Sequence, residues 1–159
     1  MAETTKSKSV RPIPEGFTTV TPFLMLDDAP RFLEFAKNAF GAEITYDLRD
    51  DHGEIIHSTI KIGNAQIMIA DTMGAMKAQA SMLYLYVNDV DAAYKKAVQA
   101  KAKPMDEPAD QFYGDRAGAV SDEWGNIWWF ATHIEDPSDA EIKKRAKAEM
   151  EKRKQHAHA

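Results

Sequence analysis

The stretch YGDRAGAVSDEWGNIWWFATH, residues 113–133, decides the fold of this chain. It carries all three tryptophans of the sequence, together with three glycines and an Asp-Arg pair. The Gly-Asn pair at residues 125–126 is typical of a tight turn between two antiparallel strands. The stretch therefore predicts a hairpin whose strands cover residues 113–122 and 127–133.

This hairpin closes an order of strand, helix and three strands that occurs twice along the chain. Asp28 and Asp89 begin the two predicted helices and lie 61 residues apart (89 − 28), while Gly63 and Gly125 open the last hairpins and lie 62 apart (125 − 63). Nearly equal offsets predict an internal repeat, and coincidence between two unrelated α+β segments is the alternative. The predicted strands are 18–26, 43–49, 54–62, 65–71, 81–87, 103–111, 113–122 and 127–133, and the predicted helices lie within 27–43 and 88–102.

The repeat sets the predicted domain organisation. Residues 18–135 form one domain whose two modules cover about 18–80 and 81–135. The polar residues 1–17 are predicted to be a flexible N-terminal arm. Residues 136–159 are dense in Lys, Glu and Ala and predict a C-terminal helix that is mostly solvated and frays toward its end.

Helix ends are marked by residues with specific capping chemistry. Asp28 is a good N-cap, Pro30 suits a first turn, and Gly41 suits the position after a helix. Ser138 precedes Glu141 by three positions, which completes a capping box for the C-terminal helix.

Composition excludes several classes of function. The chain has 159 residues, 44% of them hydrophobic, a net charge of −5 and no cysteine. An acidic chain is a poor partner for nucleic acid, and the absence of cysteine excludes disulfides, thiol catalysis and Cys-ligated metal. No apolar run reaches the roughly 18 residues that a membrane helix needs. We expect a cytoplasmic protein that binds neither nucleic acid nor membrane.

The two modules resemble the vicinal oxygen chelate superfamily, which includes glyoxalase I, extradiol dioxygenases and bleomycin-resistance proteins. The resemblance covers about residues 18–135 and is closest to the PhnB-like branch. The segments that carry it are FLMLDDAPRFLEFAKNAFGAE, HSTIKIGNAQIMIAD, LYLYVNDVDAAYKKAV and PADQFYGDRAGAVSDEWGNIWWFATHIED.

The resemblance implies an α+β fold. Each module curls a four-stranded sheet around a cleft with its helix outside, and two modules complete a half-open curved sheet or barrel within one chain or between chains. It also implies a homodimer. Relatives usually have Gly after the second helix, so Lys101 predicts a slightly strained or extended helix end there, without functional meaning.

In metal-dependent relatives, four cleft positions hold His or Glu ligands. Counting from the helix starts and the last hairpins places these positions on Thr21, Met68, Met82 and Trp129. None of the four is a plausible ligand for a hard or borderline divalent ion. We therefore expect no metal and no other cofactor, with an unmapped metal site as the alternative.

The mapping combined with strand alternation predicts which residues line the cleft. Trp128 then faces a helix and Trp129 the cleft, and His57 is the only mid-strand histidine. Arg116 is a candidate clamp for a ligand carboxylate or phosphate, although Asp115 and Arg116 must face opposite ways, so one of them instead ties the strand to a neighbouring loop. The predicted ligand-binding residues are Phe23, Met25, His57, Met68, Met82, Tyr84, Tyr86, Arg116 and Trp129.

A pocket of this composition suits a flat or apolar small molecule, although the aromatic residues could simply fill the core of a small barrel. The leading interpretation is a metal-free protein that sequesters or recognises a small organic ligand, as bleomycin-resistance proteins do. One alternative is a metal-independent isomerase or lyase in which His57 is the catalytic residue and transfers protons. A second alternative is a metal-dependent glyoxalase-like lyase.

Overall fold

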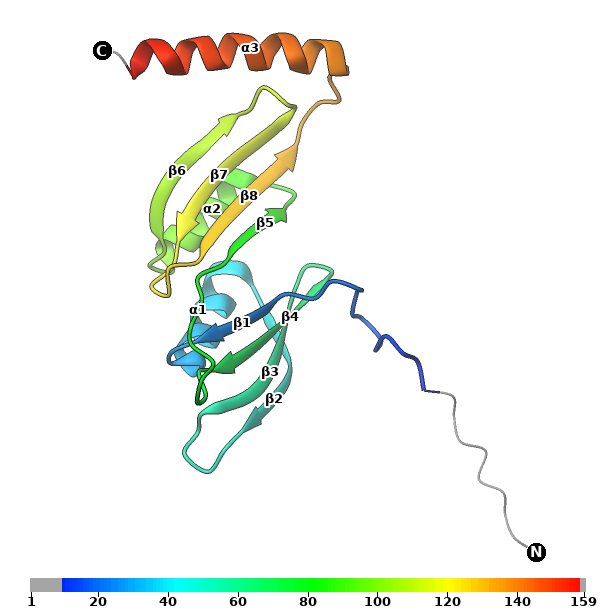
Figure 1. Cartoon of the computed structure of the whole chain (residues 1–159), viewed down its shortest axis with the longest axis vertical. Helices are drawn as coiled ribbons and strands as arrows, with labels where there is room; N and C mark the ends of the chain where they lie inside the picture. The colour runs from blue at the N-terminus through cyan, green and yellow to red at the C-terminus, as the bar shows by residue number, and fades with distance from the viewer. Residues whose placement is uncertain (1–9, 158–159) are drawn as a thin grey trace, which may run out of the picture.

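A computed structural model describes residues 10–157 and contains two β-α-β-β-β modules followed by one helix (Figure 1). The predicted arm over residues 1–17 lies partly outside this range, as does the end of the predicted tail at residues 158–159. The elements are β1 (Phe23–Leu26), α1 (Ala29–Phe40), β2 (Glu43–Arg49), β3 (Ile55–Ile62), β4 (Ala65–Asp71), β5 (Met82–Tyr86), α2 (Val90–Gln99), β6 (Lys103–Asp110), β7 (Asp115–Ser121), β8 (Ile127–His133) and α3 (Asp139–His156).

Each module contains one four-stranded mixed sheet. Sheet 1 has the strand order β1-β4-β3-β2, and sheet 2 repeats it as β5-β8-β7-β6. The first and last strands of each module pair in parallel because a helix connects the first strand to the rest, whereas the other pairs are antiparallel. The predicted α+β class and the internal repeat are confirmed, and the two sheets stay separate instead of closing into a barrel.

Helix ends follow the capping chemistry of the sequence. The Asp28 side chain accepts a hydrogen bond from the Arg31 amide, and Gly41 ends α1 at a φ of 66°. The Asp89 side chain caps α2 in the same way, accepting from the Ala92 amide at 3.0 Å. After α2, Lys101 has a φ of 78°, a left-handed conformation that costs an ordinary residue about 1–2 kcal/mol. The predicted strain at this helix end is confirmed.

The first strand is shorter than predicted. It begins at Phe23, not at residue 18, because the preceding threonines bond to their own backbone. The Thr18 hydroxyl donates to the Val20 oxygen at 2.6 Å, and the Thr21 hydroxyl donates to the Thr18 oxygen at 3.0 Å. Such local hydrogen bonds compete with strand pairing, so this segment is irregular, with a bend at residues 19–20, despite its β-branched residues.

The two modules share one hydrophobic core. Trp128 of sheet 2 is fully buried and packs on two phenylalanines of α1, with ring centroids 6.3 Å from Phe32 and 4.3 Å from Phe40. The helix-facing position predicted for Trp128 is confirmed. The Trp124 indole also crosses the module boundary, because its N–H donates to the Asp27 backbone oxygen. These contacts hold the helix side of sheet 2 against α1.

A buried carboxylate organises the β7–β8 hairpin. Asp122 Oδ1 accepts from the backbone amides of Trp124 and Asn126, each at 2.9 Å. Its Oδ2 accepts from the Asn126 side chain at 2.8 Å and from the Trp128 indole at 2.9 Å. Four donors therefore compensate the burial of this charge, and they position the turn between the two strands.

The C-terminal helix α3 lies across the end of sheet 2 (Figure 1). The Ser138 side chain caps it by accepting from the Glu141 amide, as the capping box predicts. No residue of α3 is buried, and Arg145 ties the helix to Glu135 through an ion pair. Among the helices that the structure describes, none is long and apolar enough to cross a membrane.

Candidate functional site

The open face of sheet 2, on the side away from α2, carries an aromatic surface. Tyr84 and Trp129 lie opposite each other on paired strands, and their rings stack with a centroid distance of 6.2 Å. Tyr86 extends the surface, with its ring 5.4 Å from Tyr84. Tyr84 is 44% exposed and Tyr86 68% exposed, so the rings do not fill a core within this chain.

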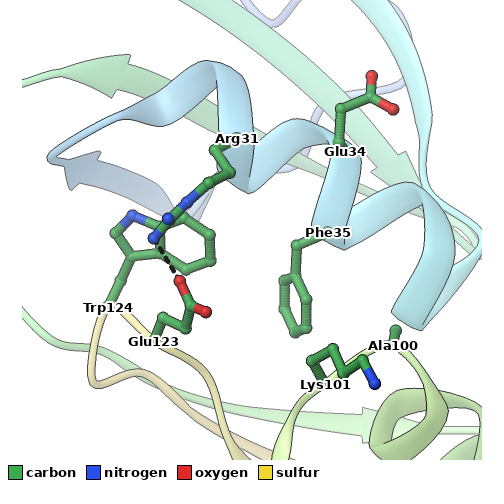
Figure 2. Close-up of a pocket in the computed structure, with 7 residues that line it drawn as sticks. All are labelled: Arg31, Glu34, Phe35, Ala100, Lys101, Glu123 and Trp124. Carbon is green, nitrogen blue, oxygen red and sulfur yellow. Dashed lines mark hydrogen bonds and ion pairs between the residues drawn. The ribbon is translucent and has the colours of Figure 1, made fainter.

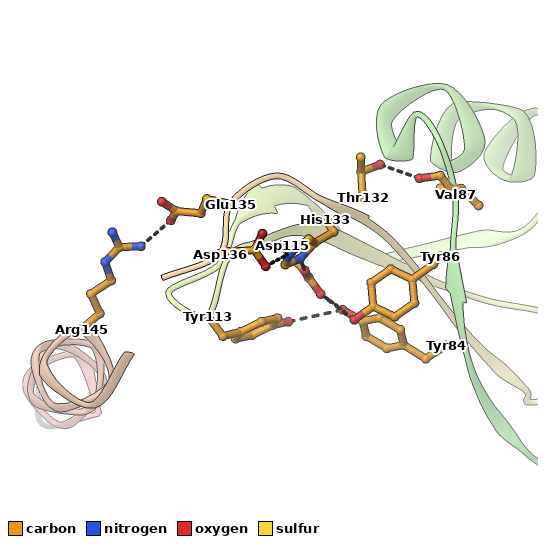
Figure 3. Close-up of polar contacts among 10 residues, drawn as sticks. All are labelled: Tyr84, Tyr86, Val87, Tyr113, Asp115, Thr132, His133, Glu135, Asp136 and Arg145. Carbon is orange, nitrogen blue, oxygen red and sulfur yellow. Dashed lines mark hydrogen bonds and ion pairs between the residues drawn. The ribbon is translucent and has the colours of Figure 1, made fainter. Parts of the chain in front are cut away.

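A buried carboxylate lies beneath the hydroxyl ends of these tyrosines (Figure 3). The Asp115 side chain is only 5% exposed, and its Oδ2 accepts from the Tyr86 hydroxyl at 2.9 Å. The Tyr84 hydroxyl lies 3.5 Å from the same oxygen and 3.4 Å from the Tyr113 hydroxyl. Two phenols therefore meet at one carboxylate, and the third contacts it through the Tyr84 hydroxyl.

His133 connects the same carboxylate to a second one. Its Nδ1 lies 2.7 Å from Asp115 Oδ1, and its Nε2 lies 2.9 Å from Asp136 Oδ1. An ionised carboxylate can only accept hydrogen bonds, so both ring nitrogens must carry hydrogen for both contacts to form. The hydrogen bond to Asp115, and then that to Asp136, raise the pKa of His133 above its usual value, which favours the imidazolium.

Burial and hydrogen bonds keep Tyr84 and Tyr86 protonated. Burial, followed by the hydrogen bond with Tyr113, raises the pKa of Tyr84. The hydrogen bond to Asp115 raises the pKa of Tyr86. Both side chains are therefore neutral near physiological pH and present hydroxyl groups, not phenolates, to anything on this face.

Strand register brings this cluster together. Asp115 begins β7 and pairs directly with His133 at the end of β8. Gly114 precedes them with a φ of 103°, and an added Cβ there would clash with the Glu135 backbone oxygen. The close approach lets the Gly114 oxygen accept from the Ile134 amide at 2.9 Å and from the Glu135 amide at 3.1 Å. These contacts position the segment that carries Asp136.

The open face of sheet 1 carries the other predicted residues. The His57 ring lies between Phe23, at a centroid distance of 5.8 Å, and Tyr46, at 6.1 Å. Met68 pairs opposite Phe23 and so shares their face. The structure thus divides the predicted set between two sheets: Phe23, Met25, His57 and Met68 on sheet 1, and Met82, Tyr84, Tyr86 and Trp129 on sheet 2.

Arg116 does not join either aromatic face. It pairs with Thr132 on the helix side of sheet 2, and its guanidinium bonds to Asp91 of α2 at 2.8 Å and to Asp110 of β6 at 3.0 Å. These two carboxylates occupy the guanidinium and raise the pKa of Arg116. The sequence leaves two roles open for Arg116, a clamp for a ligand anion and a tie between its strand and a neighbouring segment. In the structure Arg116 ties its strand to α2 and β6.

Two hollows lie beside the open faces or on the helix side. A groove of about 630 Å³ runs between β5 and the β3–β4 hairpin, and Met82, Tyr84 and Tyr86 contribute to its wall. A smaller pocket of about 200 Å³ lies where α1 meets the β7–β8 hairpin (Figure 2). There Arg31 stacks over the Trp124 ring at 5.3 Å and pairs with Glu123, so the ion pair joins the two modules.

Comparison with known proteins gives the family. The model of the glyoxalase/bleomycin resistance protein/dioxygenase superfamily matches residues 18–130. The chain belongs to this superfamily. The resemblance predicted from the sequence is confirmed at this level.

Proteins similar to this chain are distant in sequence. An uncharacterized protein of Mycobacterium bovis is 29% identical over 134 residues, covering 77% of this chain and 88% of that protein. TioX from Micromonospora sp. ML1 shares the fold with a TM-score of 0.60 and 21% identity, over 72% of this chain and 99% of TioX. The PhnB protein from Bacillus cereus gives a TM-score of 0.60 and 20% identity, over 72% of this chain and 99% of PhnB.

The donor set at the predicted metal positions of this superfamily does not fit a divalent cation. Met68 and Met82 offer thioethers, and Trp129 offers an indole, which are not ligands for hard or borderline divalent ions. Thr21 lies before β1, and its hydroxyl bonds to the Thr18 oxygen. No step of a metal-dependent reaction can therefore be assigned to these four residues.

The predicted site residues lack four members of the cluster at this end of sheet 2, namely Tyr113, Asp115, His133 and Asp136. The first two flank Gly114, and alternation places Asp115 opposite in direction to Arg116. The missing information was register, because Asp115 and His133 are 18 residues apart in sequence yet directly paired across the hairpin. Counting back from the turn at Gly125 could have found this pair.

Proposed function

We propose that this protein binds a small organic molecule on its open sheet faces and does so without a metal ion. The observation that carries the proposal is the aromatic surface of the exposed Tyr84 and Tyr86 and the half-buried Trp129 above the buried Asp115. Rigid aromatic side chains with a few fixed polar groups are typical of small-molecule sites. The poor donor set at the superfamily's metal positions supports the metal-free part of the proposal.

A homodimer would complete the site. The two aromatic faces belong to different sheets of one chain, and each leaves large apolar side chains exposed, including Phe23 and Tyr46 on sheet 1. Contiguous exposed apolar surface commonly marks an interaction site. In the proposed dimer, sheet 1 of one copy lies opposite sheet 2 of the other, so that His57 and Tyr86 contribute to the same cleft.

Binding is favoured over proton transfer by His57. The His57 ring lies against the aromatic rings of Phe23 and Tyr46, an environment that suits packing against a flat ligand. His57 therefore serves as a wall of the cleft in this proposal.

Calorimetric titration with small flat aromatic compounds tests the binding proposal. Quinoline and its N-methyl cation are suitable first probes, followed by a wider set of aromatic compounds. Trp129→Leu and Tyr84→Leu should each weaken binding about tenfold, because a stacked aromatic contact contributes about 0.5–1.5 kcal/mol beyond the area it buries. Tyr94→Leu is a matched change on α2, away from the open face of sheet 2. It should leave the affinity within about twofold, because distant residues without shared contacts act independently.

Three results would overturn parts of this proposal. Equal loss in the Tyr94 variant would move the site away from the aromatic face. A stoichiometric divalent ion in protein purified without chelator, whose removal abolishes binding, would refute the metal-free part. A solution mass of one chain, 17.8 kDa instead of twice that value, would refute the shared cleft.

A further inference from the structure

We propose that the Tyr84–Tyr86–Trp129 face selects organic cations, with the buried carboxylate of Asp115 as the charge that recognises them. This inference rests on the proposed function and adds the chemical class of the ligand. It is carried by three features of the face: the charge beneath it, the hydrogen atoms already committed within it, and the orientation of its rings.

The charge beneath the face is negative. Asp115 and Asp136 each carry one negative charge, and the imidazolium of His133 between them carries one positive charge, so the group retains one net negative charge. Asp115 lies nearest the rings and is almost excluded from solvent, which weakens the screening of its field. A ligand on the rings therefore experiences a fixed negative potential at the hydroxyl ends of the tyrosines.

The donors at this end of the face are already engaged. The Tyr86 hydroxyl donates its hydrogen to Asp115. The Tyr84 hydroxyl lies within hydrogen-bond distance of both the Tyr113 hydroxyl and Asp115. Both nitrogens of His133 contact carboxylates. What the phenols still offer is oxygen lone pairs, which accept hydrogen bonds. A ligand N–H would find acceptors here, whereas a ligand carboxylate would meet a like charge and engaged donors.

The rings add a second attraction for positive charge. Tyr84 and Trp129 stack nearly parallel, with an interplanar angle of 17°, and the Tyr86 ring is inclined to Tyr84 by 58°. Their outer surfaces present the negative part of the ring quadrupole, to which cations are attracted, most strongly over Trp. Flat shape and positive charge are therefore recognised by the same surface.

Three bicyclic probes of similar size separate charge from shape. Calorimetry near neutral pH compares 1-methylquinolinium, which is a cation, with quinoline, which is neutral, and 1-naphthalenesulfonate, which is an anion. We expect the wild-type protein to bind the cation at least about tenfold more tightly than quinoline, which corresponds to about 1.4 kcal/mol. The sulfonate should bind most weakly of the three.

Asp115→Asn keeps the size of the side chain and removes its charge. It should reduce the affinity for 1-methylquinolinium about tenfold and change that for quinoline by less than about threefold. The control is Asp110→Asn, which changes the net charge equally on the opposite face of sheet 2 and should preserve the preference for the cation. If Asp115→Asn does not fold, a salt series on the wild-type protein replaces it: added salt should weaken binding of the cation but not of quinoline.

The outcomes distinguish the two proposals. If quinoline or the sulfonate binds the wild-type protein as tightly as the cation, the inference about charge fails and the small-molecule function stands. Failure of Asp115→Asn to lower the preference, or an equal effect of Asp110→Asn, also overturns the inference. If none of the three probes binds the wild-type protein, the aromatic face is not a site for flat small molecules, and both proposals fail.

Discussion

Removing the Asp122 carboxylate should strongly lower the free energy of unfolding, because this carboxylate organises the β7–β8 hairpin. Asp122→Ala leaves four donors without their acceptor, of which the Asn126 side chain and the Trp128 indole belong to fully buried residues. A buried donor left unsatisfied costs about 1–3 kcal/mol, so two of them predict a loss of about 2–6 kcal/mol. The Trp124 amide is only partly buried and can bond to water, so it adds less, whereas the Asn126 amide belongs to the same fully buried residue and adds to the loss.

Asp122→Asn should have an intermediate effect. Its oxygen can still accept from the amides of Trp124 and Asn126, but its NH₂ group then faces the Asn126 NH₂ group and the Trp128 indole N–H, which are both donors. We expect a loss of at least about 2 kcal/mol, because two buried donors lose their acceptor at about 1–3 kcal/mol each, and a smaller loss than for Asp122→Ala, because the two turn amides keep their acceptor.

Chemical denaturation followed by circular dichroism and tryptophan fluorescence measures these losses. Asp51→Ala, at the exposed β2–β3 turn, is the matched control and should change the free energy of unfolding by less than about 0.5 kcal/mol. A loss below about 1 kcal/mol for Asp122→Ala would refute the reasoning, because it would mean that water or a shift of the turn replaces the carboxylate at little cost.

Further predictions concern a helix end, a histidine and a close backbone approach. Lys101→Gly should raise the free energy of unfolding by about 0.5–1 kcal/mol in the same denaturation assay, because relief of the left-handed backbone strain exceeds the entropy cost of glycine. The control Lys95→Gly, inside α2, should lower the free energy of unfolding by about 1 kcal/mol. NMR titration of the His133 ring should give a pKa above the usual 6.5. The stabilisation from its contacts with Asp115 and Asp136 is then fully present below pH 6.5 and is lost as the pH rises through the pKa of the folded state. A ring that titrates below 6.5 contradicts the hydrogen bonds from His133 to the two carboxylates. Gly114→Ala should cost about 2–4 kcal/mol, from its positive φ and a clash with a backbone oxygen after β8, and a loss under about 1 kcal/mol would show that the loop yields freely.

Local patterns in the sequence determine most element positions. Caps at Asp28 and Asp89 and the turn at Gly63 depend on neighbouring residues alone, so their effects are visible in one segment of sequence. The opposite orientation of Trp128 and Trp129 follows from alternation in the same way. The start of β1 was misplaced because the threonines at 18 and 21 can satisfy either a strand or a turn.

The site needed information that a single segment does not contain. Alternation indicates that Asp115 and Arg116 diverge, but only the packing of α2 and β6 decides which of them meets carboxylates on the helix side. The approach of His133 to Asp115 depends on the register of a hairpin, and that of Asp136 depends on the turn at Gly114. These long-range contacts determine the charge of the open face, and residue types alone do not reveal them.

The fully buried Trp128 makes the two repeats inseparable. Its ring belongs to the second module but rests on Phe32 and Phe40 of the first, so a cut between residues 80 and 81 would expose apolar surface on both fragments. Two segments with the same topology are therefore one cooperative unit, and calorimetric melting should show a single transition. Expressed alone, either half should aggregate, whereas co-expressed halves should reassemble around this indole.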